Sequence, residues 1–267
     1  MSWETIVVQE QGPAVVITLN RPDRLNAMTD VMVDEIGRAL RTATIRPETR
    51  AVVLTGAGRA FSSGADVGQR LATKFADPDA PAYAFRYDPH TDFSDMLRIV
   101  EDVPVPVIAA INGLCVGGGL ELAMTCDLRF AADTAKLGLT EPRVGLMPGS
   151  GGVVRLVKLV GIDVAKEMLF LGHFLSGSEA QAVRLVTRTF PDGELLPETL
   201  RWVGELAEQA PVAVKMAKLA CNATWNSGIE NALAFERIAH SVVRSTEDHR
   251  EGIEAFKAKR PAVFKGR

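Results

Sequence analysis

Apolar residues in the first half of the chain gather in short runs that end at glycine- or proline-containing turns. Runs of strand length occupy Ala14–Asn20, Ala51–Leu54, Val107–Ile111 and Leu128–Ala132. The run at Val107–Ile111 contains no polar residue, which is typical of a strand that is buried on both faces of a parallel sheet. The pattern therefore predicts an α/β fold.

Between the first two runs, the spacing of the apolar positions changes to that of a helix. Val33, Ile36 and Leu40 recur three to four residues apart behind Thr29, a residue type that caps helix N-termini. A strand, a helix and a second strand within about 40 residues form a crossover, which pairs the two strands in parallel.

The most informative stretch is Val107–Asp127, VIAAINGLCVGGGLELAMTCD. After the strand it passes through three glycines, residues 117–119, and continues as an apolar helix that carries one carboxylate, Glu121. Glycine lets a ligand approach the backbone closely, and the first turn of a helix presents unpaired N–H groups to a negative oxygen. The stretch predicts either a site of N–H donors with a carboxylate beside it or a tight turn before a core helix.

Helices dominate beyond residue 197, where the strand signals thin out. Pro211 suits the first turn of a helix. Ser227–Glu230 matches the capping-box pattern, which opens a helix, as does Ser178–Gln181 earlier in the chain, before this boundary. We therefore expect a mixed α/β core at residues 1–196 and a helical region at residues 197–267.

Length and charge restrict the class of protein. A chain of 267 residues can form one large domain with a substantial core. Its net charge is −3, and acidic and basic residues are mixed along the sequence. The chain therefore lacks the basic stripe of a nucleic-acid binder. No apolar run approaches the roughly 20 residues that span a bilayer, and the first residues lack the pattern of a signal peptide. With no C-x-x-C spacing among Cys115, Cys126 and Cys221, we expect a cytoplasmic protein with reduced cysteines and no membrane partner.

Two loops after the second strand have the composition of ligand contacts. Thr55–Val67 is rich in glycine and small residues, so a ligand could approach its backbone, although an ordinary surface loop has the same composition. Gly68–Ser94 contains prolines, tyrosines and phenylalanines. We expect this long connection to pack either on the apolar part of a ligand or on the core.

Several common site motifs are absent. The glycines do not complete G-x-G-x-x-G, no G-K-[ST] is present for a P-loop, and Ser150 lacks the G-x-S-x-G context of a nucleophile elbow. The histidines are scattered without the spacing of metal ligands or of a Ser-His-acid triad. What remains is backbone donors and two carboxylates in apolar surroundings, Glu121 and Glu141.

Taken together, the segments resemble the crotonase (enoyl-CoA hydratase/isomerase) family from about Ile6 to the C-terminal KGR. The resemblance is carried, in order, by LNRPDRLNA at 19–27, AFSSGAD at 60–66, IAAING at 108–113, GGGLELA at 117–123, Cys126-Asp127, Glu141, Gly145 and PGSGG at 148–152. It implies a crotonase-type spiral of ββα units. It also implies C-terminal helices that assemble the chain into a trimer, commonly a dimer of trimers.

The resemblance further implies an acyl-CoA thioester as the ligand. Coenzyme A would arrive as part of the substrate, and no metal or redox cofactor would be needed. By position, the N–H groups of Ala65 and Gly118 would form an oxyanion hole. The loops Arg24–Ala27 and Ser63–Val67, with Asp66 among their residues, would hold the CoA moiety largely through backbone atoms.

The two glutamates indicate the reaction. Hydratases of the family carry one glutamate just after the triple glycine and a second one 20 residues later, which is the separation of Glu121 and Glu141. The family's Δ3,Δ2-enoyl isomerases usually keep only the second. The pair therefore favours hydration of a 2-enoyl-CoA, with Glu121 activating water and Glu141 supplying the proton to C2. An apolar setting raises the pKa of a carboxyl group, which suits this chemistry.

Other members of the family leave alternatives open. The same oxyanion hole serves isomerisation, dehydration of carnitinyl-CoA, decarboxylation, thioester hydrolysis and C–C lyase reactions. Thr140 precedes Glu141 where the family usually has proline, and Pro142 follows it. RNA binding through a lysine-rich helix has little support, because the first predicted helix, at residues 29–43, contains no lysine.

Overall fold

The computed structural model describes residues 2–66, 68 and 92–267. Val67 and most of the connection expected at Gly68–Ser94 therefore lie outside the described residues. Within the described ranges, no helix has both the length and the apolar character that crossing a membrane requires.

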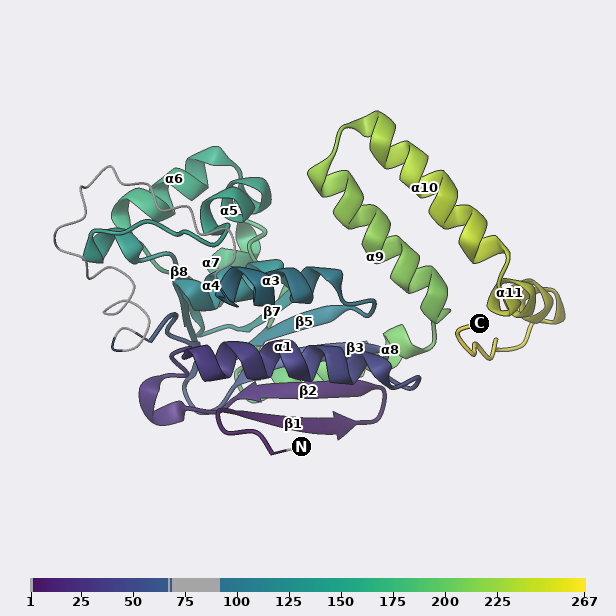
Figure 1. Ribbon diagram of the computed structural model, residues 1–267, viewed down its shortest axis with the longest axis horizontal. Coiled ribbons are helices and arrows are strands. Elements are labelled where there is room, and N and C mark those ends of the chain that lie inside the picture. The colour runs from purple at the N-terminus through teal and green to yellow at the C-terminus, as the bar shows by residue number, and fades with distance from the viewer. Residues whose placement is uncertain (1, 67, 69–91) are drawn as a thin grey trace.

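A sheet of six strands forms the centre of the molecule (Figure 1). Its first two strands form an antiparallel hairpin, and all the other neighbours in it pair in parallel. The strand predictions made from the apolar runs are confirmed, and every residue of the run at Val107–Ile111 is buried. In spatial order the strands are β1 (Ile6–Gln11), β2 (Ala14–Leu19), β3 (Ala51–Gly56), β5 (Val107–Ile111), β7 (Leu128–Ala132) and β10 (Arg188–Phe190).

A second sheet is built from very short strands that follow those of the first. Gly56 and Gly113 stand at two of the joints, where a Cβ would lie only 2.0 Å from the Ala60 carbonyl oxygen and 2.2 Å from that of Arg59. No side chain fits there, so each strand can turn directly from one sheet into the other. The strands are β4 (Ala60–Ser62), β6 (Leu114–Val116), β8 (Lys136–Gly138) and β9 (Leu175–Ser176).

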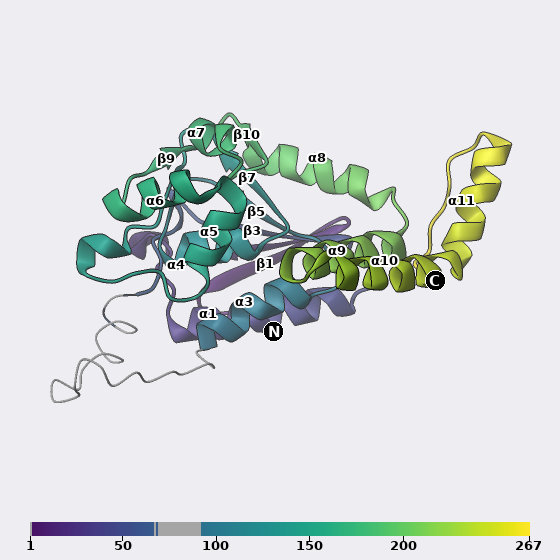
Figure 2. The ribbon, with the colours of Figure 1, turned by 90° about the horizontal axis from the view of Figure 1, so that it is seen from above.

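Helices cover both faces of the large sheet (Figure 2). On one face lie α1 (Asp30–Ile45) and α3 (Asp92–Asp102), and on the other lies α8 (Leu195–Ala207). The predicted cap of α1 is confirmed, because the Thr29 hydroxyl accepts the Met32 N–H at 3.2 Å. The parallel pairing of β2 with β3 confirms the predicted crossover.

The second sheet carries the remaining short helices of the core at one end of the molecule (Figure 1). Each ββ pair is thus followed by helical structure, which gives the expected spiral of ββα units. The helical segments of this part are η1 (Pro22–Arg24), α4 (Gly118–Thr125), η3 (Glu141–Val144), α5 (Gly152–Val160), α6 (Ile162–Leu171) and α7 (Gly177–Ala182).

Three helices, which we call the C-terminal arm, extend away from the core (Figures 1 and 2). They are α9 (Pro211–Asn226), α10 (Ile229–Arg244) and α11 (Glu247–Ala258). The helix before them, α8, begins at Leu195, two residues ahead of the expected boundary, and packs on the sheet through its buried Val203. The helical region is therefore present, while its division from the core as a separate unit stays a prediction.

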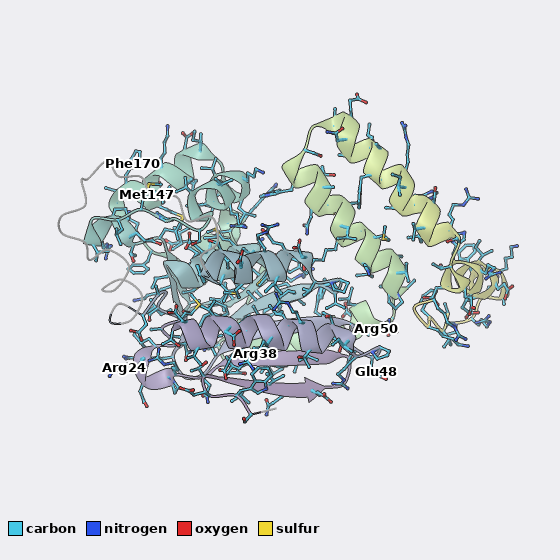
Figure 3. All side chains as sticks on the ribbon, viewed as in Figure 1. Arg24, Arg38, Glu48, Arg50, Met147 and Phe170 are labelled. Atoms are coloured by element: carbon cyan, nitrogen blue, oxygen red, sulfur yellow. The ribbon has the colours of Figure 1, made fainter. Side chains whose placement is uncertain are left out.

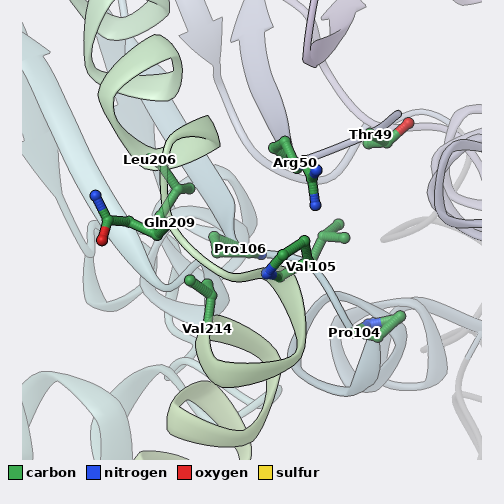
Figure 4. Close-up of a pocket in the computed structure, with 9 residues that line it drawn as sticks. Thr49, Arg50, Pro104, Val105, Pro106, Leu206, Gln209 and Val214 are labelled. Carbon is green, nitrogen blue, oxygen red and sulfur yellow. The ribbon is translucent and has the colours of Figure 1, made fainter. Parts of the chain in front are cut away.

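A small cavity of about 20 Å³, room for one water molecule, lies where the arm joins the core (Figure 4). Its walls come from the segments before β3 and β5 and from the connection between α8 and α9, with Thr49, Pro104 and Val214 among the lining residues. None of its lining residues belongs to the loops or carboxylates singled out from the sequence.

Both predicted capping boxes are wrong. The box of α7 is formed by Ser176, whose hydroxyl accepts the Glu179 N–H at 3.2 Å while the Glu179 carboxylate accepts the Ser176 N–H at 2.8 Å. The box therefore begins two residues earlier than predicted, and Glu179 takes the place that was expected for Gln181. At α10 the cap is Gly228, and the Ser227 hydroxyl instead donates to the Ala223 carbonyl, because so short a connection leaves Ser227 to close α9.

Candidate active site

The loop at Gly64–Asp66 lies against the N-terminus of α4. A Cβ at Gly64 would lie 3.2 Å from the backbone nitrogen of Gly118, and a Cβ at Gly118 would lie 3.6 Å from that of Ala65. Neither Ala65 nor Gly118 donates its N–H to another group in the described part of the chain. Two backbone donors from separate segments, neither with an acceptor among the described residues, are thus close neighbours.

A buried asparagine shapes the loop that precedes α1. Leu25 and Asn26 both have left-handed backbone, with φ of 51° and 54°. The Asn26 side chain is fully buried, accepts the Arg21 N–H at 2.9 Å and donates to the Ala57 and Ala60 carbonyl oxygens at 2.9 and 2.7 Å. Asparagine tolerates this conformation better than most residues do, and that preference was the available signal for a role that sequence reasoning missed.

The two loops expected to hold CoA are joined to each other through serines. The Ser62 hydroxyl donates to the Asn26 carbonyl at 2.9 Å and accepts the Gly64 N–H at 3.1 Å. The Ser63 N–H donates to the Leu25 carbonyl at 2.9 Å, and the Ser63 hydroxyl reaches the Arg24 carbonyl at 3.4 Å. This cross-linking holds the loop that carries Ala65 in a defined position.

The side chains expected at the CoA loops differ in how they are engaged. Asp66 forms an ion pair with Arg21 at 2.9 Å, and its N–H donates to the Met28 carbonyl. Ala27 is buried, and its carbonyl accepts from the Arg21 guanidinium at 2.6 Å. Arg24 is exposed and lies at the end of the molecule opposite the arm (Figure 3). Asp66 and Ala27 thus support the loops, and Arg24 presents its side chain outward.

Glu121 lies in the interior of α4 and is held by backbone amides. Its side chain is 4% exposed, and Oε1 accepts the N–H groups of Ser150 and Gly152 at 2.9 and 3.0 Å. Burial raises the pKa of the Glu121 carboxyl above its ordinary value, while these hydrogen bonds and the charge of Arg155 act in the opposite direction. The carboxylate is therefore fixed through one oxygen in an apolar environment.

Glu141 opens η3 and faces the same helix terminus. One of its carboxyl oxygens lies 3.4 Å from the position that a Cβ of Gly117 would take. Its other oxygen, Oε2, is buried with no hydrogen-bond partner among the described residues. Burial raises the pKa of Glu141 above its ordinary value. The residue's own backbone N–H lowers this pKa, while the negative charge of Glu121 raises it.

The local backbone accommodates the unusual order Thr140-Glu141-Pro142, in which the proline follows the glutamate. Pro142 lies in the first turn of η3, where a missing N–H costs nothing. Thr140 lies just before this segment, in an irregular conformation. Gly145 closes the segment with left-handed backbone and donates to the Pro142 carbonyl at 3.2 Å. A proline after the glutamate, instead of before it, therefore forms part of a short helix.

Apolar side chains line the space beside the donors. The Met28 Cε and Phe93 Cζ atoms would lie 3.2 and 3.4 Å from a Cβ at Gly118. Both residues are buried. Phe93 belongs to the aromatic connection that was expected to pack either on a ligand or on the core. Met28 was not singled out from the sequence, because an apolar residue carries no sign of which site it will border.

These features define a class of protein: a spiral of ββα units in which a helix N-terminus and a neighbouring loop each present an N–H donor that has no partner among the described residues, beside two carboxyl groups of raised pKa. Such a site can polarise a carbonyl oxygen and transfer protons beside it. The chain belongs to the enoyl-CoA hydratase/isomerase family, whose model matches residues 9–267.

Individual relatives agree with this assignment. A probable enoyl-CoA hydratase of Rhizobium meliloti is 38% identical over the whole of both chains, and a crotonyl-CoA hydratase of Syntrophomonas wolfei is 34% identical over 99% of its length and of this chain. The crystal structure of an enoyl-CoA hydratase from Bacillus anthracis superposes with a TM-score of 0.91 at 35% identity, covering 99% of this chain and 100% of its own. The predicted family, fold class and enzyme type, a hydro-lyase of the enoyl-CoA hydratase kind, are confirmed.

Proposed function

We propose that this protein adds water across the C2=C3 double bond of a 2-enoyl-CoA thioester. The observation that supports the proposal is the convergence of Glu121 and Glu141 on the N-terminus of α4, beside the N–H groups of Ala65 and Gly118, which have no acceptor within the described ranges. The family assignment and the names of the relatives support an acyl-CoA thioester as the substrate class.

The backbone donors would stabilise the charge that develops on the thioester oxygen. Attack of water at C3 moves electron density through C2 onto that oxygen, forming an enolate. Ala65 and Gly118 would each donate a hydrogen bond to it, and donors of this kind are worth about 3–4 kcal/mol each in a transition state. Because Ala65 belongs to a cross-linked loop and Gly118 begins a buried helix, they would need little rearrangement as the charge forms.

The carboxyl groups would divide the proton transfers. The hydrogen bonds to Glu121 from the described part of the chain all reach Oε1, so its second oxygen can accept the proton of the attacking water. The Oε2 atom of Glu141, which has no partner among the same residues, can carry the proton that C2 receives. A raised pKa brings each group nearer to neutral pH, where a carboxyl group both gives and takes a proton effectively.

Product analysis with crotonyl-CoA tests the proposal. We expect the absorbance of the conjugated thioester to fall and 3-hydroxybutyryl-CoA to appear. A product with a shifted double bond, or free CoA, would instead identify one of the other reactions of the family. Turnover over a panel of enoyl-CoA thioesters of different length and branching would then define the acyl group.

We also propose that the arm mediates assembly into a trimer or a dimer of trimers. Ile229, Ile238 and Phe256 expose 67%, 63% and 85% of their surface, and a cavity of about 440 Å³ opens between α9, α10 and α11. Apolar surface of this extent is typical of an interface. Light scattering after size-exclusion chromatography measures the mass, and a monomeric, fully active protein would contradict the proposal.

A further inference from the structure

Glu121 is anchored by a loop that has little rigidity of its own. Ser150 and Gly152, which supply the two N–H donors, alternate with Gly149 and Gly151, and Gly151 has left-handed backbone with φ of 91°. Glycine has many accessible conformations, so such a loop holds a carboxylate in place only if other contacts restrain it.

Arg155 supplies the restraint from the first turns of α5. Its Nη1 donates to the Ser150 carbonyl at 3.0 Å. Its backbone N–H donates to the Gly151 carbonyl at 3.0 Å, but this is the first hydrogen bond of α5, which any residue except proline would form at this position. The guanidinium lies directly over the loop, because a Cβ at Gly151 would come within 2.1 Å of Nη1. Ser150 is thus held on both sides, with its N–H bound to Glu121 and its carbonyl bound to Arg155.

Glu101 at the end of α3 holds the other side of the guanidinium. Its Oε1 accepts from Nε and Nη2 of Arg155 at 2.9 and 2.7 Å. The Glu101 backbone is in turn fixed by the arm, because the Asn222 side chain donates to its carbonyl at 3.2 Å and the buried Lys218 Nζ donates to the Val100 carbonyl at 3.3 Å. Arg155 therefore spans from a secured helix end to the loop.

The geometry points to Arg155, oriented by Glu101, as a positioning residue that aligns Glu121 for catalysis through the Ser150–Gly152 loop. This inference deepens the proposed function, since it rests on the assigned role of Glu121. Arg155 touches neither the substrate site nor the reacting atoms; it acts on the group that does. Supporting the hydrogen-bond partner of a catalytic group in this way typically matters about 10- to 100-fold in activity.

The charge of Arg155 adds an electrostatic effect to the positioning. The charged groups that act on Glu121 in the described part of the chain are Arg155 from α5 and Glu141 from η3, with Glu101 behind the guanidinium. Burial raises the pKa of Glu121, and Arg155 opposes that rise, which favours the ionised form that accepts a proton from water. Loss of the arginine should move the pKa of Glu121 upward.

Substitutions of the pair separate geometry from charge. We expect Arg155→Met to lower kcat about 10- to 100-fold with KM nearly unchanged, and to move the acidic limb of the kcat/KM pH profile to higher pH. Arg155→Lys keeps the charge but loses the planar fork, so kcat should fall part of the way while the pH profile stays in place. Glu101→Gln keeps an acceptor oxygen and should cause the smallest loss of the three.

Arg201→Met is the matched control, because Arg201 forms ion pairs with Glu198 and Glu205 on the exposed face of α8 and should leave kcat and the pH profile unchanged. Infrared titration of glutamate carboxyls labelled with ¹³C, with the Glu121→Gln spectrum subtracted, measures the pKa of Glu121 without any turnover. An unchanged Glu121 pKa and unchanged kcat in Arg155→Met would overturn the inference, as would a loss shared equally by kcat, CoA-ester binding and melting temperature. If the wild-type protein fails to hydrate enoyl-CoA, the proposed function fails, and the titration still decides the role of Arg155.

Discussion

The two carboxyl groups of the site are held in opposite ways. Glu121 belongs to a buried helix and is fixed by two amides of a loop that follows it by some thirty residues in the sequence. Glu141 opens a short 3₁₀ segment, and its Oε2 has no partner among the described residues. One carboxylate is thus positioned by the fold, and the other retains an oxygen that is free for chemistry.

A third buried carboxylate shows why this difference matters. Glu35 is only 3% exposed, and burial pushes its pKa upward, but hydrogen bonds from the Thr5 hydroxyl and from the Glu4 and Thr5 N–H groups lower it below the ordinary value. Both oxygens of Glu35 are satisfied, so it stays ionised. Burial therefore raises the pKa of Glu121 and Glu141, because the hydrogen bonds that oppose it there are too few to reverse its effect as they do at Glu35.

The largest effects should come from removing either proton-transfer group. Glu121→Gln and Glu141→Gln should each lower kcat by about 10²- to 10⁴-fold, the usual contribution of a positioned acid or base. Binding of a saturated acyl-CoA should persist, because the thioester oxygen would still meet Ala65 and Gly118. Steady-state kinetics and calorimetric binding measure the two quantities, and a variant that kept wild-type turnover would remove that glutamate from the mechanism.

Displacing the anchored carboxylate without removing it should have the next largest effect. A Cβ at Gly152 would lie 2.8 Å from the Glu121 Oε1 atom and 2.7 Å from the Pro148 Cβ, so Gly152→Ala must displace the carboxylate, the proline or both. We expect kcat to fall about 10²-fold, as for other small misplacements of a catalytic group. Gly149→Ala is the control in the same loop, because nothing lies within 4 Å of its would-be Cβ. Equal activity in both alanine variants would show that the anchor is dispensable.

Patterns of apolar and polar residues along the chain predicted much of the core that carries the two carboxyl groups. Val107–Ile111 was predictable because it lacks any polar residue, and Thr29 because it precedes residues at helical spacing. The second sheet was not, since three-residue strands such as Leu114–Val116 are too short to show a period.

The contacts that hold the site were beyond prediction from local patterns for a different reason. The donors to Glu121 are backbone N–H groups of Ser150 and Gly152, and every residue except proline has one. Only the folded chain shows which of them meet the carboxylate. The catalytic roles of Glu121, Glu141, Ala65 and Gly118 therefore stay predictions, although the structure brings these residues together.

A smaller effect should appear in the pH dependence of stability. A carboxyl group whose pKa is raised by folding contributes stability that is complete below its ordinary value of 4.5 and is lost as pH rises through the raised value. Glu141→Gln removes an ionised form that the folded state disfavours, so it should melt a few degrees higher than wild type at mildly basic pH and equally at acidic pH. Glu121→Gln should gain less, because it loses charge-assisted bonds from Ser150 and Gly152. Calorimetry across this pH range measures the melting temperatures. A larger rise in Glu121→Gln than in Glu141→Gln would contradict the proposed difference between the two carboxyl groups.

Glu35 should give the opposite sign and no effect on turnover. Its lowered pKa means that it contributes stability above its ordinary value of 4.5, and that this contribution is lost as pH falls through the lowered one. Glu35→Gln places an amide N–H₂ against groups that are themselves donors, which should cost about 1–3 kcal/mol at neutral pH. Denaturant unfolding measures this loss, and kcat measured on the folded variant should equal that of wild type. If kcat fell without a loss of stability, Glu35 would take part in catalysis. Burial of a carboxylate, and not its incomplete hydrogen bonding, would then distinguish the catalytic groups.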